Sequence, residues 1–145
     1  MIKLIFIIFF SILIPNQKNE IIKVLEEYNQ TFVKSDYSKI ISYFNYPVSF
    51  NLSEKTITAS NKLKLKLIYK KLRGSLPIDY AYSTWDKINI QLIDNNIAIV
   101  NADFSRYDKN DISIYSGSVI YHLRLIENNW KIFTLTPYLN TETLN

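Results

Sequence analysis

Four segments in the second half of the chain alternate between apolar and polar residues and are separated by three short turns rich in Asp and Asn. The segments span residues 80–93, 97–107, 112–126 and 130–137. Alternation with a period of two is typical of half-buried strands. Asp and Asn suit the backbone conformations that tight turns need. The pattern therefore predicts a series of antiparallel strands, each joined to the next by a hairpin.

The residues before these strands have helical spacing. Ile21, Leu25, Tyr28 and Phe32 are spaced to line one face of an amphipathic helix that begins near residue 18. Ser35 and Asp36 end this helix, and Asp36 can cap a short second helix over residues 37–44. Pro47 is expected to end that second helix, because a proline disfavours the helical conformation of the residue before it.

A hairpin and a third helix follow. Segments 48–52 and 55–59 alternate in the manner of two paired strands. Ser60 and Asn61 offer an N-cap for a helix that runs through Leu72, with Gly74 and Pro77 as its stop signals. Three helices and a mostly antiparallel sheet predict a single α+β domain, with the helices on one face of the sheet.

Composition excludes several classes of function. The chain has 145 residues, of which 48% are hydrophobic, so one folded domain is expected. It contains no Cys and one His, His122, which leaves no disulfide framework or thiolate metal site and little basis for a zinc site. Its two Gly residues cannot build a Gly-rich phosphate loop. We therefore expect no metal and no cofactor.

The net charge of +4 arises largely from one basic stretch in the third helix. Its lysines alternate with leucines, which is interpreted as the solvated face of an amphipathic helix rather than as a nucleic-acid interface. We expect no nucleic-acid partner.

Residues 1–16 differ from the rest of the chain. Lys3 precedes an apolar run over 4–14, which is shorter than a membrane-spanning helix and favours a secretory signal or an uncleaved hydrophobic anchor. An apolar segment packed on the domain is the alternative. The protein would be exported or membrane-anchored in the first case and cytoplasmic otherwise. The folded domain is expected over 18–138, followed by a short tail at 139–145.

Several short phrases, in their order, resemble the nuclear transport factor 2-like superfamily, which includes SnoaL-like and ketosteroid-isomerase-like proteins. They are NQTFVKSD, ISYF, YPV, ADFSRY, YHLR and NWKI, and the resemblance covers about residues 18–138. It implies a cone-shaped fold, with three N-terminal helices on a curved, mainly antiparallel sheet and a ligand in the open end. It also implies a homodimer formed through the sheet face.

The resemblance and the strand alternation together indicate a ligand pocket. The residues expected to line it are Phe50, Trp85, Val100, Phe104, Arg106 and Tyr121. Arg106 could bind a carboxylate or phosphate through two parallel hydrogen bonds, or could be a solvated arginine at the rim. His122 falls on the opposite face of its strand, so a surface or interface role is expected for it.

No catalytic residue is assigned. Residues 47–52 lack the carboxylate that ketosteroid-isomerase-like enzymes carry near the first strand, and residues 130–137 contain no Asp, Glu or His. The leading hypothesis is therefore a small-molecule-binding or assembly module with an apolar pocket for a small hydrophobic or anionic ligand. The alternative is an isomerase, cyclase or dehydratase, which would need an inward Asp103 or Asp79, or Tyr46 and Tyr121 as proton donors.

Overall fold

A computed structural model of the chain describes residues 16–139. The predicted signal or anchor and the predicted tail lie outside this range, apart from Asn16 and Leu139. No helix within 16–139 combines the length and the apolar character needed to cross a bilayer.

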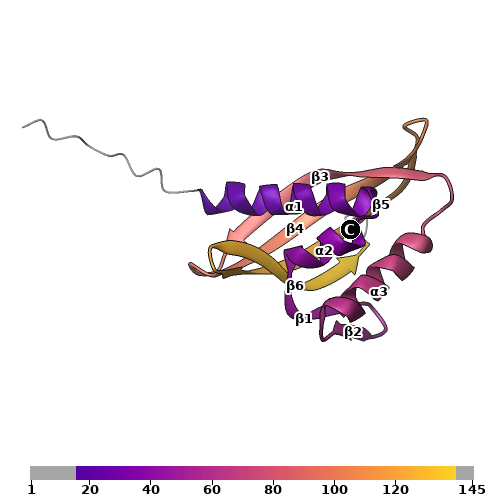
Figure 1. The fold of residues 1–145 in the computed structure, drawn as a ribbon. Helices are drawn as coiled ribbons and strands as arrows, with labels where there is room; N and C mark the ends of the chain where they lie inside the picture. Colours follow the sequence, from indigo (N-terminus) through magenta and orange to yellow (C-terminus); the bar gives the residue numbers. More distant parts are fainter. Residues whose placement is uncertain (1–15, 140–145) are drawn as a thin grey trace, which may run out of the picture.

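Within residues 16–139, three α-helices and one 3₁₀ helix accompany a single six-stranded sheet, and the α-helices lie on the same side of it (Figure 1). The helices are α1 (Gln17–Val33), α2 (Tyr37–Ile40), the 3₁₀ helix η1 (Ile41–Tyr43) and α3 (Lys62–Gly74). The strands are β1 (Phe44–Asn51), β2 (Thr56–Ala59), β3 (Tyr80–Leu92), β4 (Ile97–Asp108), β5 (Ser113–Ile126) and β6 (Asn129–Tyr138). The predicted α+β class, with helices on a curved and mainly antiparallel sheet, is confirmed.

The order of strands in the sheet is β2-β1-β6-β5-β4-β3, so the sheet is open and β2 and β3 form its edges. The three predicted hairpins of the second half are present as the antiparallel pairs β3–β4, β4–β5 and β5–β6. The sequence pattern did not predict that β1 pairs in parallel with β6. This pairing joins the N-terminal hairpin to the meander and makes one continuous sheet.

The second helix is shorter than predicted, and the strand after it begins earlier. The α-helical turn ends at Ile40, and β1 starts at Phe44 rather than at Val48. Pro47 lies inside β1 instead of ending a helix. It is tolerated there because the pairing between β1 and β6 is irregular between Phe44 and Ser49, so no regular ladder needs its missing N–H.

Helix ends follow the capping residues that the sequence predicts. The side chain of Asp36 accepts a hydrogen bond from the backbone N–H of Lys39 at 3.0 Å. Asn61 accepts one from the N–H of Lys64 at 2.9 Å. Gly74 differs from its predicted role, because it is the last helical residue and its φ is not positive.

Removal of the Asn61 cap is expected to destabilise the domain by about 1 kcal/mol, because one N–H in the first turn of α3 loses its side-chain acceptor. The test is urea denaturation of Asn61→Ala against wild type. Ser60→Ala is the matched control, since Asn61 and not Ser60 provides the side-chain cap. Equal stability of the two variants would contradict the capping role.

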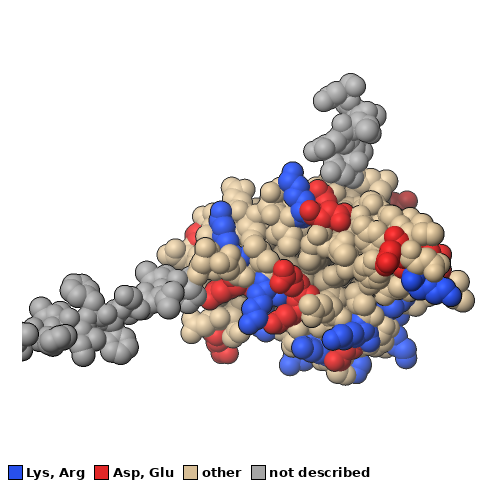
Figure 2. All heavy atoms as spheres, turned by 90° about the horizontal axis from the view of Figure 1, so that it is seen from above, with Lys and Arg blue, Asp and Glu red and all other residues tan. Residues whose placement is uncertain are grey.

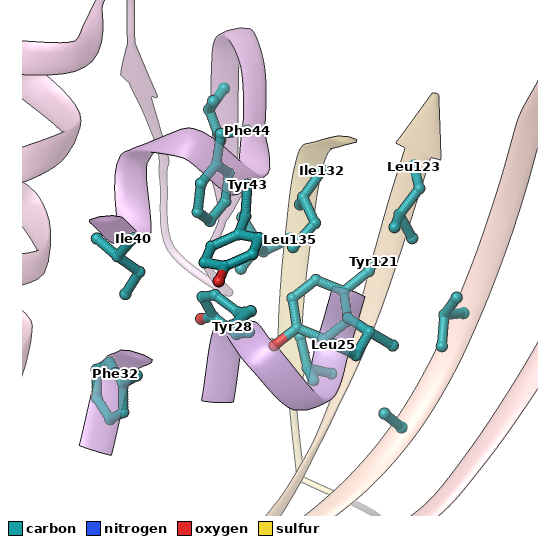
Figure 3. Close-up of a cluster of buried hydrophobic side chains, with 14 of the residues drawn as sticks. Leu25, Tyr28, Phe32, Ile40, Tyr43, Phe44, Tyr121, Leu123, Ile132 and Leu135 are labelled. Atoms are coloured by element: carbon teal, nitrogen blue, oxygen red, sulfur yellow. The ribbon is translucent and has the colours of Figure 1, made fainter. Parts of the chain in front are cut away.

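The core lies between α1, α3 and the inner face of the sheet. Ile21 and Leu25 of α1 are completely buried, as the helical spacing predicts, and so are Leu123 and Ile132 of the sheet. Figure 3 shows aromatic rings from α1, η1, β1 and β5 gathered among these aliphatic side chains. Tyr28 is central among them and packs edge-on against Tyr43, Phe44, Tyr69 and Tyr121. The aromatic part of the core extends to a cavity between the helices and the sheet.

Candidate functional site

A cavity of about 140 Å³ lies between α1, α3 and the inner face of the sheet, next to the aromatic core. Each of its wall elements contributes one to three residues. All but three of the wall residues are aromatic, aliphatic or proline, and the exceptions are Asn29, Ser83 and Arg106. The wall consists of Tyr28, Asn29 and Phe32 from α1, Phe50 from β1, Leu52 from the loop between β1 and β2, Tyr69 and Leu72 from α3, Ser83 and Trp85 from β3, Phe104 and Arg106 from β4, Val119 and Tyr121 from β5, and Leu135 and Pro137 from β6.

Five of the six residues that the sequence predicts for a pocket lie at this wall, and the sixth does not. Phe50, Trp85, Phe104, Arg106 and Tyr121 line the cavity. Their role in binding a ligand stays a prediction.

Val100 is completely buried in the core and is absent from the wall. It is on the same face of β4 as Phe104 and Arg106, but nearer the start of the strand. There the inner face is filled by the core residues that include Ile21 and Leu25 of α1. Alternation therefore identified the correct face of β4 but not the point along it where the cavity begins.

Arg106 lies against the rings of Phe104 and Tyr115, which also pack against each other with 5.8 Å between their centroids. Its guanidinium carbon is 5.1 Å from the ring centroid of Phe104 and 5.1 Å from that of Tyr115. The Nε atom is buried and has no hydrogen-bond partner among the described residues. Aromatic faces attract and orient a guanidinium group without using its N–H donors. The two cation–π contacts therefore leave the N–H donors of the guanidinium group unused.

The position of Tyr115 depends on Gly117. A Cβ at Gly117 would lie 2.8 Å from Cε1 of Tyr115 and 3.2 Å from Cζ of Phe104. The missing side chain thus leaves space for the two rings that hold Arg106. The side chain of Tyr115 is 41% exposed, so it can shift at little cost to stability.

Three buried tyrosines provide further polar atoms near the cavity. The hydroxyls of Tyr28 and Tyr69 are hydrogen-bonded at 2.9 Å. Burial raises the pKa of Tyr28, although the neighbouring hydroxyls of Tyr69 and Tyr121 and the charge of Arg106 act in the opposite direction. Burial also raises the pKa values of Tyr69 and Tyr121 well above the ordinary value of 10.0. All three hydroxyls are therefore protonated at neutral pH and can act as hydrogen-bond donors.

Two further contacts fix side chains of the wall. The indole N–H of Trp85 donates to the backbone carbonyl of Leu25 at 3.1 Å. The side-chain amide of Asn29 donates to the carbonyl of Ser83 at 2.8 Å. Both bonds connect α1 to β3, so the wall on this side is held in place by the helix.

The acidic residues considered for catalysis are absent from the cavity wall. Asp103 accepts a hydrogen bond from the Ser118 hydroxyl at 2.6 Å, and these two residues are paired across β4 and β5 on the face of the sheet away from the helices. Asp79 is exposed in the loop between α3 and β3. Tyr46 donates its hydroxyl to the carbonyl of Ile41 at 2.9 Å and is likewise not part of the wall.

His122 also lies on the outer face of the sheet, where Nδ1 is 2.7 Å from the Thr134 hydroxyl. The homodimer expected through this face stays a prediction. Among residues 16–139, no three His, Asp or Glu residues are grouped closely enough to hold a metal ion. Acidic and basic side chains are interspersed over the face drawn in Figure 2, with several basic ones close together along its lower edge.

Sequence reasoning missed the helical part of the wall. Tyr28 and Phe32 were expected only as core residues, whereas each also faces the cavity. Their position on the apolar face of α1 was the available signal. It could not distinguish a core contact from a cavity contact, because both require the same apolar side chains.

A family model described as NTF2-like protein (DUF6841) matches residues 19–140 of this chain. No curated protein sequence shows a significant match. Solved structures with the same fold are numerous, and they include proteins from several bacteria.

One is a protein of unknown function with a cystatin-like fold from Nostoc punctiforme, with 14% identity, a TM-score of 0.72 and coverage of 86% of this chain and 92% of that one. An NTF-2-like protein from Shewanella oneidensis has 16% identity and a TM-score of 0.67, with coverage of 84% and 98%. A candidate aromatic ring hydroxylase from Novosphingobium aromaticivorans has 13% identity and a TM-score of 0.68, with coverage of 86% and 89%. Likeness at these identities shows the fold alone. Because the family model spans most of the chain and the observed fold agrees with it, this protein belongs to the NTF2-like protein family DUF6841.

Proposed function

We propose that this domain binds a small, mainly apolar molecule in the cavity between α1, α3 and the sheet. The observation that carries the proposal is the composition of the wall, which is apolar or aromatic except at Asn29, Ser83 and Arg106. Concave apolar sites with a few fixed polar groups are the usual form of small-molecule sites. Transfer of an apolar ligand from water to such a wall is favourable.

Binding is favoured over acid–base catalysis by the same wall. It contains no Asp, Glu or His, and its tyrosines have raised pKa values, so they are poor proton acceptors at neutral pH. Asp103 and Asp79 would have to leave their present positions to reach a ligand. We therefore do not advance the enzymatic alternative.

Benzyl alcohol is a suitable first probe, because it is neutral and has a single ring. We expect wild type to bind it with millimolar to micromolar affinity, measured by ligand-observed NMR titration. Leu72→Trp should weaken binding at least tenfold. Leu72 lies at the wall, so the larger indole ring of tryptophan would fill the cavity.

Leu67→Trp provides the matched control. It makes the same substitution in the same helix, but Leu67 is 59% exposed and absent from the wall. Binding that survives Leu72→Trp unchanged, or that both variants reduce equally, would rule out the cavity as the site. Absence of binding to wild type would reject the proposal for single-ring molecules.

A further inference from the structure

We infer that the ligand of this cavity is a single-ring aromatic carboxylic acid, whose carboxylate binds Arg106 and whose ring occupies the apolar part of the cavity. This inference rests on the proposed binding function and adds a chemical class to it. It is carried by the charge at the wall, the unmet hydrogen-bond donor of Arg106 and the size of the space.

The first argument concerns charge. Arg106 is the only charged residue of the cavity wall. The one ion pair among residues 16–139 joins Lys23 and Glu27 on the exposed face of α1, so no carboxylate of the described chain is paired with Arg106. A cation held in an apolar wall without a counter-charge favours an anionic ligand, and no acidic wall residue would repel that anion.

The second argument concerns hydrogen bonding. Arg106 forms no ion pair within the described residues, and its Nε, which protein atoms cover, has no hydrogen-bond partner. A carboxylate can accept two parallel bonds from the two terminal guanidinium nitrogens. The ring centroids of Phe104 and Tyr115 each lie 5.1 Å from the guanidinium carbon, and a cation–π contact uses none of these donors.

Arg73 shows that the unmet donor alone is not sufficient. Its Nε is also buried without a partner, and its guanidinium carbon lies 4.5 Å from the ring centroid of Tyr80. Arg73 is absent from the cavity wall, however. Only at Arg106 do the positive charge, the free donor and the apolar space occur together.

The third argument concerns size. An apolar cavity of about 150 Å³ in another protein accepts benzene, so the 140 Å³ here has room for one ring. The rings of Phe50, Trp85 and Phe104 in the wall provide edges and faces against which an aromatic ligand can pack. A benzoate-like acid satisfies all three conditions.

The test compares three single-ring probes of similar size by NMR titration or calorimetry, namely benzoate, benzamide and benzyl alcohol, together with decanoate as a long-chain acid. We expect wild type to bind benzoate at least tenfold more tightly than benzamide. Arg106→Gln should weaken benzoate binding at least tenfold and change benzyl alcohol binding by less than twofold. Arg106→Lys should recover only part of the affinity, since it restores the charge without the two parallel hydrogen bonds.

Arg124→Gln is the matched control. Arg124 is also a sheet arginine over an aromatic ring, with its guanidinium carbon 4.4 Å from the centroid of Phe133, but it lies on the outer face. It should leave benzoate affinity within twofold of wild type. Circular dichroism of each variant tests whether the fold is retained. The comparison of benzoate with benzamide and benzyl alcohol on wild type is independent of any variant, so it tests the inference even if a variant does not fold.

The outcomes separate the two proposals. If wild type binds benzyl alcohol as well as benzoate, cavity binding stands and the acid assignment is overturned. Equal loss of benzoate affinity in Arg106→Gln and Arg124→Gln would also overturn it, because a general charge effect would then explain the binding. Tighter binding of decanoate than of benzoate would reject the single-ring class. If none of the probes binds, both proposals fail.

Discussion

Tyr69→Ala is expected to lower the free energy of unfolding by about 3–5 kcal/mol, the range for removal of a large buried aromatic side chain. Tyr69 of α3 is only 1% exposed. Its ring centroid lies 5.6 Å from that of Phe44, 5.9 Å from that of Phe50 and 6.1 Å from that of Tyr28. The substitution would leave a void between the helix and the sheet and would remove the partner of the Tyr28 hydroxyl. Urea denaturation followed by circular dichroism measures the change.

The size of this effect matters because domains of this kind are stable by about 5–15 kcal/mol in total. Leu67→Ala is the matched control in the same helix. Its side chain is 59% exposed, so its loss should cost about 0.5 kcal/mol. Tyr69→Phe should fall between the two variants, because it keeps the ring and loses only the hydrogen bond. A Tyr69→Ala variant no less stable than Leu67→Ala would show that the aromatic packing does not hold α3 to the sheet.

Stability is also expected to fall steeply above pH 10. Burial raises the pKa values of Tyr28, Tyr69 and Tyr121 in the folded protein, whereas in the unfolded chain they titrate near 10. Below pH 10 both states keep these protons and stability does not depend on them. Above it the unfolded state loses protons that the folded state retains, so the free energy of unfolding decreases as pH rises.

Each such tyrosine contributes a slope of about 1.4 kcal/mol per pH unit, so the three together give about 4 kcal/mol per unit until they ionise in the folded state. The measurement is the urea unfolding free energy at pH 9, 10 and 11. Tyr121→Phe should reduce the slope by about one third, which separates this effect from general charge repulsion. Unchanged stability between pH 9 and 11, or a slope unaffected by Tyr121→Phe, would contradict the buried and protonated state of these hydroxyls.

The meander could be predicted from sequence because its determinants are local. Asp111, Glu127 and Asn128 adopt positive φ values in two of the connecting turns, and turns of this kind depend on residues within a few positions of each other. The end of the second helix could not be predicted in this way. The helix ends before Phe44 because this residue and those after it pair with β6, beginning with Phe44 opposite Ile132. No pattern in the sequence near Phe44 indicates that distant partner.

The same distinction applies to the site. The alternation of β4 and β5 was enough to place Phe104, Arg106 and Tyr121 on the inner face. Whether an inner residue belongs to the core or to the cavity depends on how far the helices cover the sheet. That is a property of packing in three dimensions, so Val100 was assigned to the pocket and Tyr28 only to the core.

The parallel pairing of β1 with β6 has a consequence for the order in which the protein is completed during synthesis. Ser49 is paired with Thr134, so the first and the last strands to leave the ribosome are neighbours in the sheet. A nascent chain that ends after β5 exposes unpaired edges on both β1 and β5, and such edges favour association with other chains. It also lacks Leu135 and Pro137, the last part of the cavity wall. A premature stop codon in β6 would therefore remove both the closure of the sheet and part of the cavity wall, although it deletes only a small part of the chain.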